Sequence, residues 1–111
     1  MELHTEHLNG DATVIRVRGR LNMVAAPRLR TLVGETVSGG RVRIVVDLGE
    51  TDFMDSSGLG ALIAGLKTAR QAGGDLRIAR PTPQVETVLK LTNVDRVLRP
   101  HSSVEGALGD G

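Results

Sequence analysis

The chain has 111 residues, of which 40% are hydrophobic and 24% charged, with a formal net charge of +1. This length supports one domain with its own core, and we expect residues 1–111 to form a single domain. The chain contains no Cys, which excludes disulfides and thiolate metal sites. The sequence shows no signal-peptide core, and it has no apolar run of the roughly 20 residues needed to span a bilayer. We therefore expect a cytoplasmic protein without a membrane partner.

The N-terminal part of the chain predicts a β-hairpin. Residues 3–8 and 13–18 are strand candidates on either side of Asn9-Gly10-Asp11, a turn sequence whose glycine allows a positive φ. Three arginines alternate beyond the turn and share one strand face: Arg16, Arg18 and Arg20. We interpret that face as solvated, and expect no nucleic-acid partner, because one Phe and no Trp or Tyr leave little to stack on bases.

The middle of the chain predicts a helix, a buried strand and a second helix. Residues 26–37 suit a helix because Pro27 fits its first turn and apolar residues recur at helical spacing. Residues 42–48 are an almost continuous apolar run, which is typical of a central strand covered on both faces. The second helix is predicted from about Ser56 to Ala72.

The last third of the chain continues the alternation of strands and helices. Residues 76–79 predict a strand, Thr82-Pro83 begins a third helix, and residues 97–98 predict a short strand. Ser102 or Ser103 caps a last short helix. Alternation after a hairpin calls for right-handed crossovers, so we expect an α/β fold with a mixed sheet of about five strands and about four packed helices.

The most informative segment is Asp55-Ser56-Ser57-Gly58, which opens the second predicted helix. The apolar face of that helix is defined by Leu59, Leu62, Ile63 and Leu66. Ser57 lies roughly 170° from the centre of this face and Ser56 about 70° from it, which predicts that Ser57 points to solvent. Ser56 or Asp55 is then the cap. Added negative charge is favoured at such a helix start, as a phosphate-operated switch requires.

Glycines interrupt this helix, at a cost of roughly 1 kcal/mol each relative to Ala. The same helical wheel places Gly58 about 90° and Gly60 about 160° from the buried face, so internal packing explains Gly58 in part and Gly60 poorly. A bare surface beside Ser57 would let a partner approach the backbone closely. Helix capping and close packing of a helix on a sheet are the ordinary explanations of the same residues.

Enzyme motifs are not found. A dinucleotide-binding pattern begins at Gly58, but its third glycine position is Ile63. His4 and His7 lie three residues apart on a strand and so face opposite ways. We therefore expect no catalytic site, cofactor or metal. Three carboxylates near strand ends could form a magnesium site, although turn and cap roles explain them equally well: Asp47, Asp52 and Asp55.

Residues 45–74 resemble the signature of bacterial anti-sigma factor antagonists, the single-domain STAS proteins, and Asp-Ser-Ser-Gly-Leu-Gly is its most specific part. Residues 19–22, 26–27 and 91–97 resemble the family's loop, first helix and ending. The resemblance implies an STAS-like fold and partner switching: the unmodified protein binds an anti-sigma factor, often a serine kinase, and so frees a sigma factor. It also implies that this kinase phosphorylates Ser57 and that a type 2C phosphatase reverses the modification.

The resemblance assigns roles to residues around Ser57. Asp55, Ser56 and Gly58 form the switch loop and helix cap. The expected partner-binding residues are Asn22, Met23, Met54, Gly60 and Ala61. Asn22 replaces the family's preferred Asp, which removes one negative charge near the interface. We expect a monomer when the protein is free. Two alternatives are an unphosphorylated scaffold in a sensory complex, against which the retained serine argues, and a small-ligand or nucleotide-binding module.

Overall fold

The computed structural model describes residues 1–8 and 10–109. The described strands are β1 (Glu2–His7), β2 (Ala12–Leu21), β3 (Arg43–Met54), β4 (Asp75–Ala79) and β5 (Pro100–His101). The described helices are α1 (Ala26–Ser38), α2 (Ser56–Gln71), α3 (Pro83–Leu91) and α4 (Val104–Leu108), with a 3-10 turn η1 (Val94–Arg96). Asn9, the first residue of the predicted hairpin turn, lies outside the described residues, whereas Gly10 has the positive φ expected there, at 79°.

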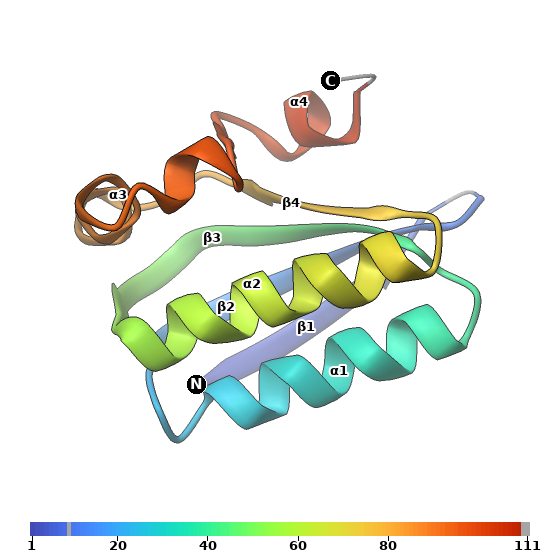
Figure 1. The fold of residues 1–111 in the computed structure, drawn as a ribbon, viewed down its shortest axis with the longest axis horizontal. Helices are drawn as coiled ribbons and strands as arrows, with labels where there is room; N and C mark the ends of the chain where they lie inside the picture. Colours follow the sequence, from blue (N-terminus) through green and yellow to red (C-terminus); the bar gives the residue numbers. More distant parts are fainter. Residues whose placement is uncertain (9, 110–111) are drawn as a thin grey trace.

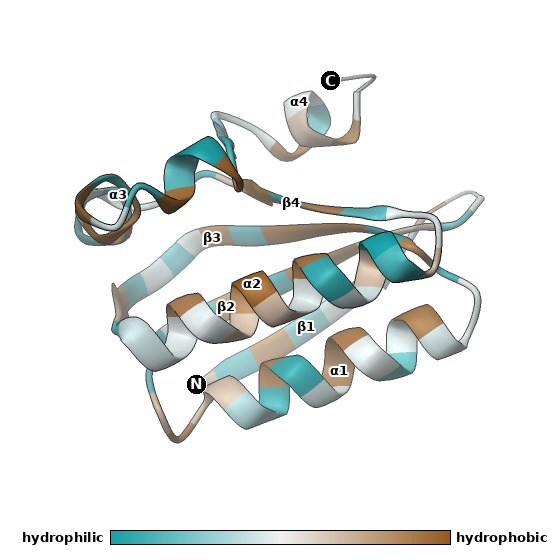
Figure 2. Ribbon diagram, viewed as in Figure 1, coloured by the Kyte–Doolittle hydropathy of each residue, from teal (hydrophilic) through white to brown (hydrophobic). Residues whose placement is uncertain are grey.

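The strands form one sheet in the order β1-β2-β3-β4-β5. The β1–β2 pair is antiparallel and the other pairs are parallel, which confirms the predicted mixed sheet with an N-terminal hairpin. Helices α1 and α2 run side by side over one face of the sheet (Figure 1). Both helices alternate hydrophobic and polar residues, as amphipathic helices on a sheet should (Figure 2).

The hydrophobic core lies mainly between the sheet and the pair α1–α2. Alternate strand residues such as Ile15 and Val46 pack there against Leu29 of α1 and Leu62 of α2. A smaller cluster on the opposite face brings Val14, Val45 and Ala79 together with Ala107 of α4. Strand β3 is therefore covered on both faces in its first half, as its continuous apolar run predicts.

Two strand predictions differ substantially from the structure. Strand β3 continues to Met54 because its polar second half still pairs with β2, as in the Leu21–Met54 register pair. The predicted strand at residues 97–98 is wrong. The Leu98 N–H donates to the Val94 carbonyl at 2.8 Å, so this segment forms a turn that buries Leu98, and β5 follows at Pro100.

Candidate functional site

Asp55 caps helix α2. Its backbone is extended, and its carboxylate accepts a hydrogen bond of 3.0 Å from the Gly58 N–H, one of the unpaired donors of the first turn. Ser56 is the first residue of the helix, its side chain is exposed, and it does not cap. Of the two cap candidates, Asp55 is therefore the cap, and it also places a negative charge at the positive end of the helix.

Ser57 is half-buried, whereas Ser56 is exposed. The predicted order of exposure is therefore wrong, because the helical wheel considered only the sheet beneath α2. Helix α1 also covers part of α2: Ala61, one turn after Ser57, is 0% exposed. Exposure alone does not select Ser57 over Ser56 as a modification site.

The glycines of α2 have different physical reasons. A Cβ at Gly58 would overlap the Leu21 carbonyl oxygen and come within 2.8 Å of Leu21 Cγ, so packing against the end of β2 requires glycine there. Internal packing therefore explains Gly58 fully, whereas the helical wheel predicted only a partial explanation. A Cβ at Gly60 would meet only Arg30 Nη2, at 3.4 Å, an ordinary contact with a flexible side chain. Gly60 therefore has open surroundings, which agrees with the prediction that internal packing explains this glycine poorly.

The loop between β2 and α1 lies beside the start of α2, since the Asp55 N–H donates to the Leu21 carbonyl at 3.4 Å. Asn22 shapes this loop: its side-chain oxygen accepts from the backbone N–H groups of Val24 and Ala25, both at 3.1 Å. A neutral amide oxygen is a sufficient acceptor for both bonds, so the loop keeps its shape without the carboxylate that the family prefers.

Two exposed apolar side chains project from this loop. Met23 is 71% exposed and Val24 is 77% exposed, although both are large and hydrophobic. Adjacent exposed apolar residues of this kind mark an interaction surface more often than an isolated one does. We call Met23, Val24 and the outward side of α2 at Ser56, Ser57 and Gly60 the switch surface. Val24 was missed from the sequence because its exposure depends on the path of the loop.

Met54 and Ala61, two of the expected partner-binding residues, do not belong to this surface. Met54 is 1% exposed and Ala61 is 0% exposed, and both side chains pack in the main core. A partner could reach them only by opening that core. Their assignment as partner contacts is therefore corrected: Met54 supports the switch surface from below, and Ala61 from within α2.

Gln84 is a positioning residue that the sequence did not reveal. From the first turn of α3, its amide oxygen accepts from the Met54 N–H at 2.8 Å and its amide nitrogen donates to the Met54 carbonyl at 3.1 Å. Nearby, the Thr82 hydroxyl donates to the Thr51 carbonyl at 2.6 Å. These bonds fix the backbone immediately before Asp55. No local pattern signals them, because they join residues about thirty positions apart.

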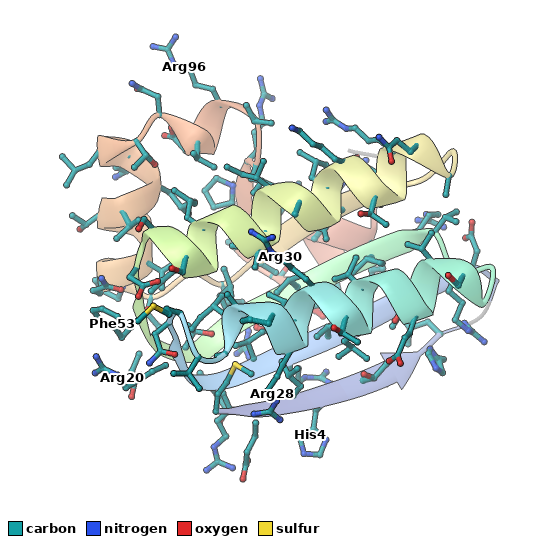
Figure 3. All side chains as sticks on the ribbon, turned by 60° about the horizontal axis from the view of Figure 1, so that its bottom comes forward. His4, Arg20, Arg28, Arg30, Phe53 and Arg96 are labelled. Carbon is teal, nitrogen blue, oxygen red and sulfur yellow. The ribbon has the colours of Figure 1, made fainter. Side chains whose placement is uncertain are left out.

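Arg30 is a second residue that sequence reasoning missed. It lies on α1 and its side chain reaches toward α2 (Figure 3). Its guanidinium sits close to Gly60, which is three residues after Ser57 and so on a neighbouring part of the same helix surface. The Arg30 guanidinium has no hydrogen-bond or ion-pair partner within the described ranges 1–8 and 10–109.

Two of the three carboxylates considered for magnesium, Asp47 and Asp55, have roles of their own, and the third, Asp52, is exposed on β3. Asp47 is 2% exposed and receives two bonds of 2.9 Å from Arg80, together with one of 3.0 Å from the Gly49 N–H. Hydrogen bonding to Asp47 and its charge raise the pKa of Arg80 above its ordinary value. Asp55 is the helix cap. In the part of the chain that the structure describes, no group of three His, Asp or Glu side chains could hold a metal.

Two of the three arginines of the β2 stripe form ion pairs with carboxylates. Arg16 pairs with Glu6 at 2.9 Å, and Arg18 pairs with Glu2 at 3.5 Å. Arg20 lies over the Phe53 ring, with its guanidinium carbon 4.2 Å from the ring centroid (Figure 3). The interpretation of this stripe as a solvated strand face agrees with these exposed pairs.

Comparison with known proteins identifies the family. The STAS domain family matches residues 3–107. An anti-sigma F factor antagonist from Paenibacillus polymyxa is 26% identical over 109 residues, which cover 97% of this chain and 92% of that protein. The crystal structure of an anti-sigma factor antagonist from Mycobacterium paratuberculosis is 26% identical, with a TM-score of 0.85 over 96% of this chain and 90% of that one.

A structure of the Bacillus cell fate determinant SpoIIAA in its phosphorylated form shares the fold, with a TM-score of 0.73 at 21% identity, over 94% of this chain and 95% of that one. The chain therefore belongs to the STAS domain family, and the curated relative named above is an anti-sigma factor antagonist, a class of regulators and not enzymes. Within the described ranges, no helix is long and apolar enough to cross a membrane.

The two glycines allow a test of why each is small. Gly58→Ala should destabilise the fold by about 3 kcal/mol, because its methyl group has no space against Leu21. Gly60→Ala should leave stability unchanged or raise it by up to ~1 kcal/mol through helix propensity. Urea unfolding of both variants measures the difference. Equal stabilities would show that α2 does not approach β2 as closely as described.

The cap assignment is tested by a neighbouring pair of substitutions. Asp55→Ala should cost ~1 kcal/mol, because it removes the acceptor of the Gly58 N–H. Ser56→Ala should change stability by no more than about 0.5 kcal/mol, because its exposed hydroxyl does not cap the helix. Thermal unfolding followed by circular dichroism separates the two. A larger loss of stability in Ser56→Ala than in Asp55→Ala would show that Ser56 is the cap.

Proposed function

We propose that this protein is an anti-sigma factor antagonist that acts in the cytoplasm by partner switching. Its unmodified form binds an anti-sigma factor through the switch surface and so releases a sigma factor. Phosphorylation of Ser57 ends that binding. The observation that carries the proposal is the position of Ser57 at the start of α2, beside a loop that exposes Met23 and Val24.

The choice of Ser57 over Ser56 rests on the family resemblance. The family's acceptor is the serine directly before the glycine, and Ser57 precedes Gly58. The SpoIIAA structure in its phosphorylated form supports the view that this fold tolerates a phosphate. We propose the anti-sigma factor itself as the serine kinase and a type 2C enzyme as the phosphatase, which act on an antagonist that is monomeric when free.

A phosphate at Ser57 should act on binding and leave the fold intact. It adds a charge of about −1.5 to −2 at pH 7. The N–H groups and dipole of a helix start favour such a charge by ~0.3 to 1 kcal/mol. At the interface the same charge must be desolvated next to the apolar side chains of Met23 and Val24. A hundredfold loss of affinity needs only about 2.7 kcal/mol, which this desolvation can supply.

We further propose that Arg30 pairs with the phosphate on Ser57. The guanidinium already lies near Gly60, one turn from Ser57, and it has no other partner in the described part of the chain. Guanidinium and phosphate form short charge-assisted bonds. Such a bond would hold the phosphate over α2, where it blocks the switch surface in a fixed position.

The alternatives remain an unphosphorylated scaffold in a sensory complex and a small-ligand-binding STAS module. Both keep the fold but give Ser57 no role. A scaffold would bind its partner equally well with or without phosphate at Ser57, so the binding experiments below distinguish it from a switch.

The proposed switch predicts how Ser57 variants bind the partner. Ser57→Ala should keep the fold and bind the anti-sigma factor even in the presence of its kinase activity and ATP. Ser57→Asp should bind at least about tenfold more weakly, because it places a negative charge on the switch surface. Titration calorimetry against the anti-sigma factors of the source organism measures both, with Ser56→Ala as the control that stays switchable. Phosphate found by mass spectrometry on Ser56, with Ser57 unmodified, would reject the assignment.

The proposed role of Arg30 is tested separately. In protein carrying phosphoserine at position 57, introduced by genetic encoding, Arg30 should hold the second pKa of the phosphate below its ordinary value of about 6. Arg30→Gln should raise that pKa by roughly 0.5, because a nearby cation favours the dianion. Phosphorus NMR titration measures the shift. Arg28→Gln is the control, since Arg28 donates instead to the Met1 carbonyl at 3.2 Å. Identical titration curves for the wild type and Arg30→Gln would show that Arg30 does not pair with the phosphate.

A further inference from the structure

A groove rich in arginine lies beside the C-terminal end of α2. It has a volume of about 370 Å³ and is bounded by the last turn of α2, by β4, and by the segment from η1 to β5. Its polar lining comprises Arg70, Asp75, Arg77, Arg96, Arg99 and His101. These residues come from two stretches of chain, 70–77 and 96–101, that only the fold brings together.

The positive charge of this groove is incompletely balanced. Asp75 is the one carboxylate in the lining, and it is shared by Arg70 and Arg77, each at 3.4 Å. Arg77 also donates to the Ala107 carbonyl at 3.0 Å, which ties it to α4. Arg96 and Arg99 are exposed, and their guanidinium groups have no hydrogen-bond or ion-pair partner among residues 1–8 and 10–109. Figure 3 shows Arg96 extended into solvent beside η1.

We propose that this groove binds a small phosphate-bearing anion. Guanidinium groups offer paired N–H donors in a planar fork that matches phosphate oxygens, and two such groups on one side of the groove are unoccupied by protein acceptors. The groove is as large as small-molecule sites commonly are. The half-exposed Val97 in the lining gives the non-phosphate part of a ligand an apolar surface to contact.

Nucleic acid is a less suitable occupant. Sequence-tolerant binding of single strands relies on aromatic side chains on which bases stack. The one aromatic residue of the chain, Phe53, lies on β3 beneath Arg20 and is not part of the lining. The net charge of the whole chain is only +1, so the positive potential is local to the groove and favours a compact ligand.

The groove is separate from the switch surface. Ser57 and Arg70 lie in the first and last turns of α2, a distance of ~20 Å at 1.5 Å per residue. Ser57, Met23 and Val24 are not among the residues that line the groove. The proposal stands independently of the phosphorylation switch, because it uses none of the residues on which that switch depends.

The test uses inorganic pyrophosphate as the probe. Titration into isotopically labelled protein at low ionic strength should shift amide resonances of residues 70–77 and 96–101 while those of residues 55–61 stay in place. Arg96→Gln/Arg99→Gln should weaken binding by at least about tenfold, since it removes both unpaired guanidinium groups. Arg18→Gln/Arg28→Gln removes the same charge from other surfaces and should retain affinity within about twofold. Melting temperatures establish that all variants are folded.

Three results would overturn the proposal. One is no saturable binding of pyrophosphate below about 10 mM, a range that even weak specific sites occupy. Another is equal weakening in both double variants, which would mean that net charge alone attracts the ion. The third is tighter binding of malonate or of a short single-stranded DNA than of pyrophosphate, which would reassign the groove to carboxylates or to nucleic acid.

Discussion

The close contact between Gly58 and the Leu21 carbonyl determines the arrangement of the switch end of the molecule. Because no side chain stands between them, the first turn of α2 rests directly on the end of β2. The loop that follows β2 is then brought beside the start of the helix, with Met23 and Val24 exposed on it. A larger residue at position 58 would separate the serines from that loop, and the two halves of the switch surface would no longer form one surface.

Other contacts hold this arrangement from behind. Gln84 bonds both backbone groups of Met54, and the Asp55 carboxylate bonds the Gly58 N–H, so the chain is fixed on both sides of the turn into α2. Asn22 holds the neighbouring loop through its side-chain oxygen. A rigid surface of this kind suits a charge switch, because a phosphate on it changes what a partner meets without requiring the protein to change shape.

Local sequence patterns predicted most of the helices and strands correctly, and tertiary packing explains the predictions that were wrong. The hairpin, the buried strand and the helices α1, α2 and α3 follow from periodicity and turn residues, which act within a few positions. The exposure of Ser57 and the burial of Ala61 depend on contacts with α1. A helical wheel drawn for α2 alone does not include those contacts. The strand expected at residues 97–98 failed because Leu98 is buried through a turn instead. Gln84, Arg30 and the arginine groove join distant segments, so no local signal could reveal them.

The central claim is that phosphate at Ser57 controls binding at an intact surface. Amide hydrogen exchange on unmodified and Ser57-phosphorylated protein tests it most directly, with the affinity for the anti-sigma factor measured on the same samples. The account predicts unchanged protection in β2, β3 and α2 together with roughly a hundredfold loss of affinity, equivalent to about 2.7 kcal/mol. Loss of protection throughout the sheet in the phosphorylated protein would contradict it, because the phosphate would then act by unfolding the domain.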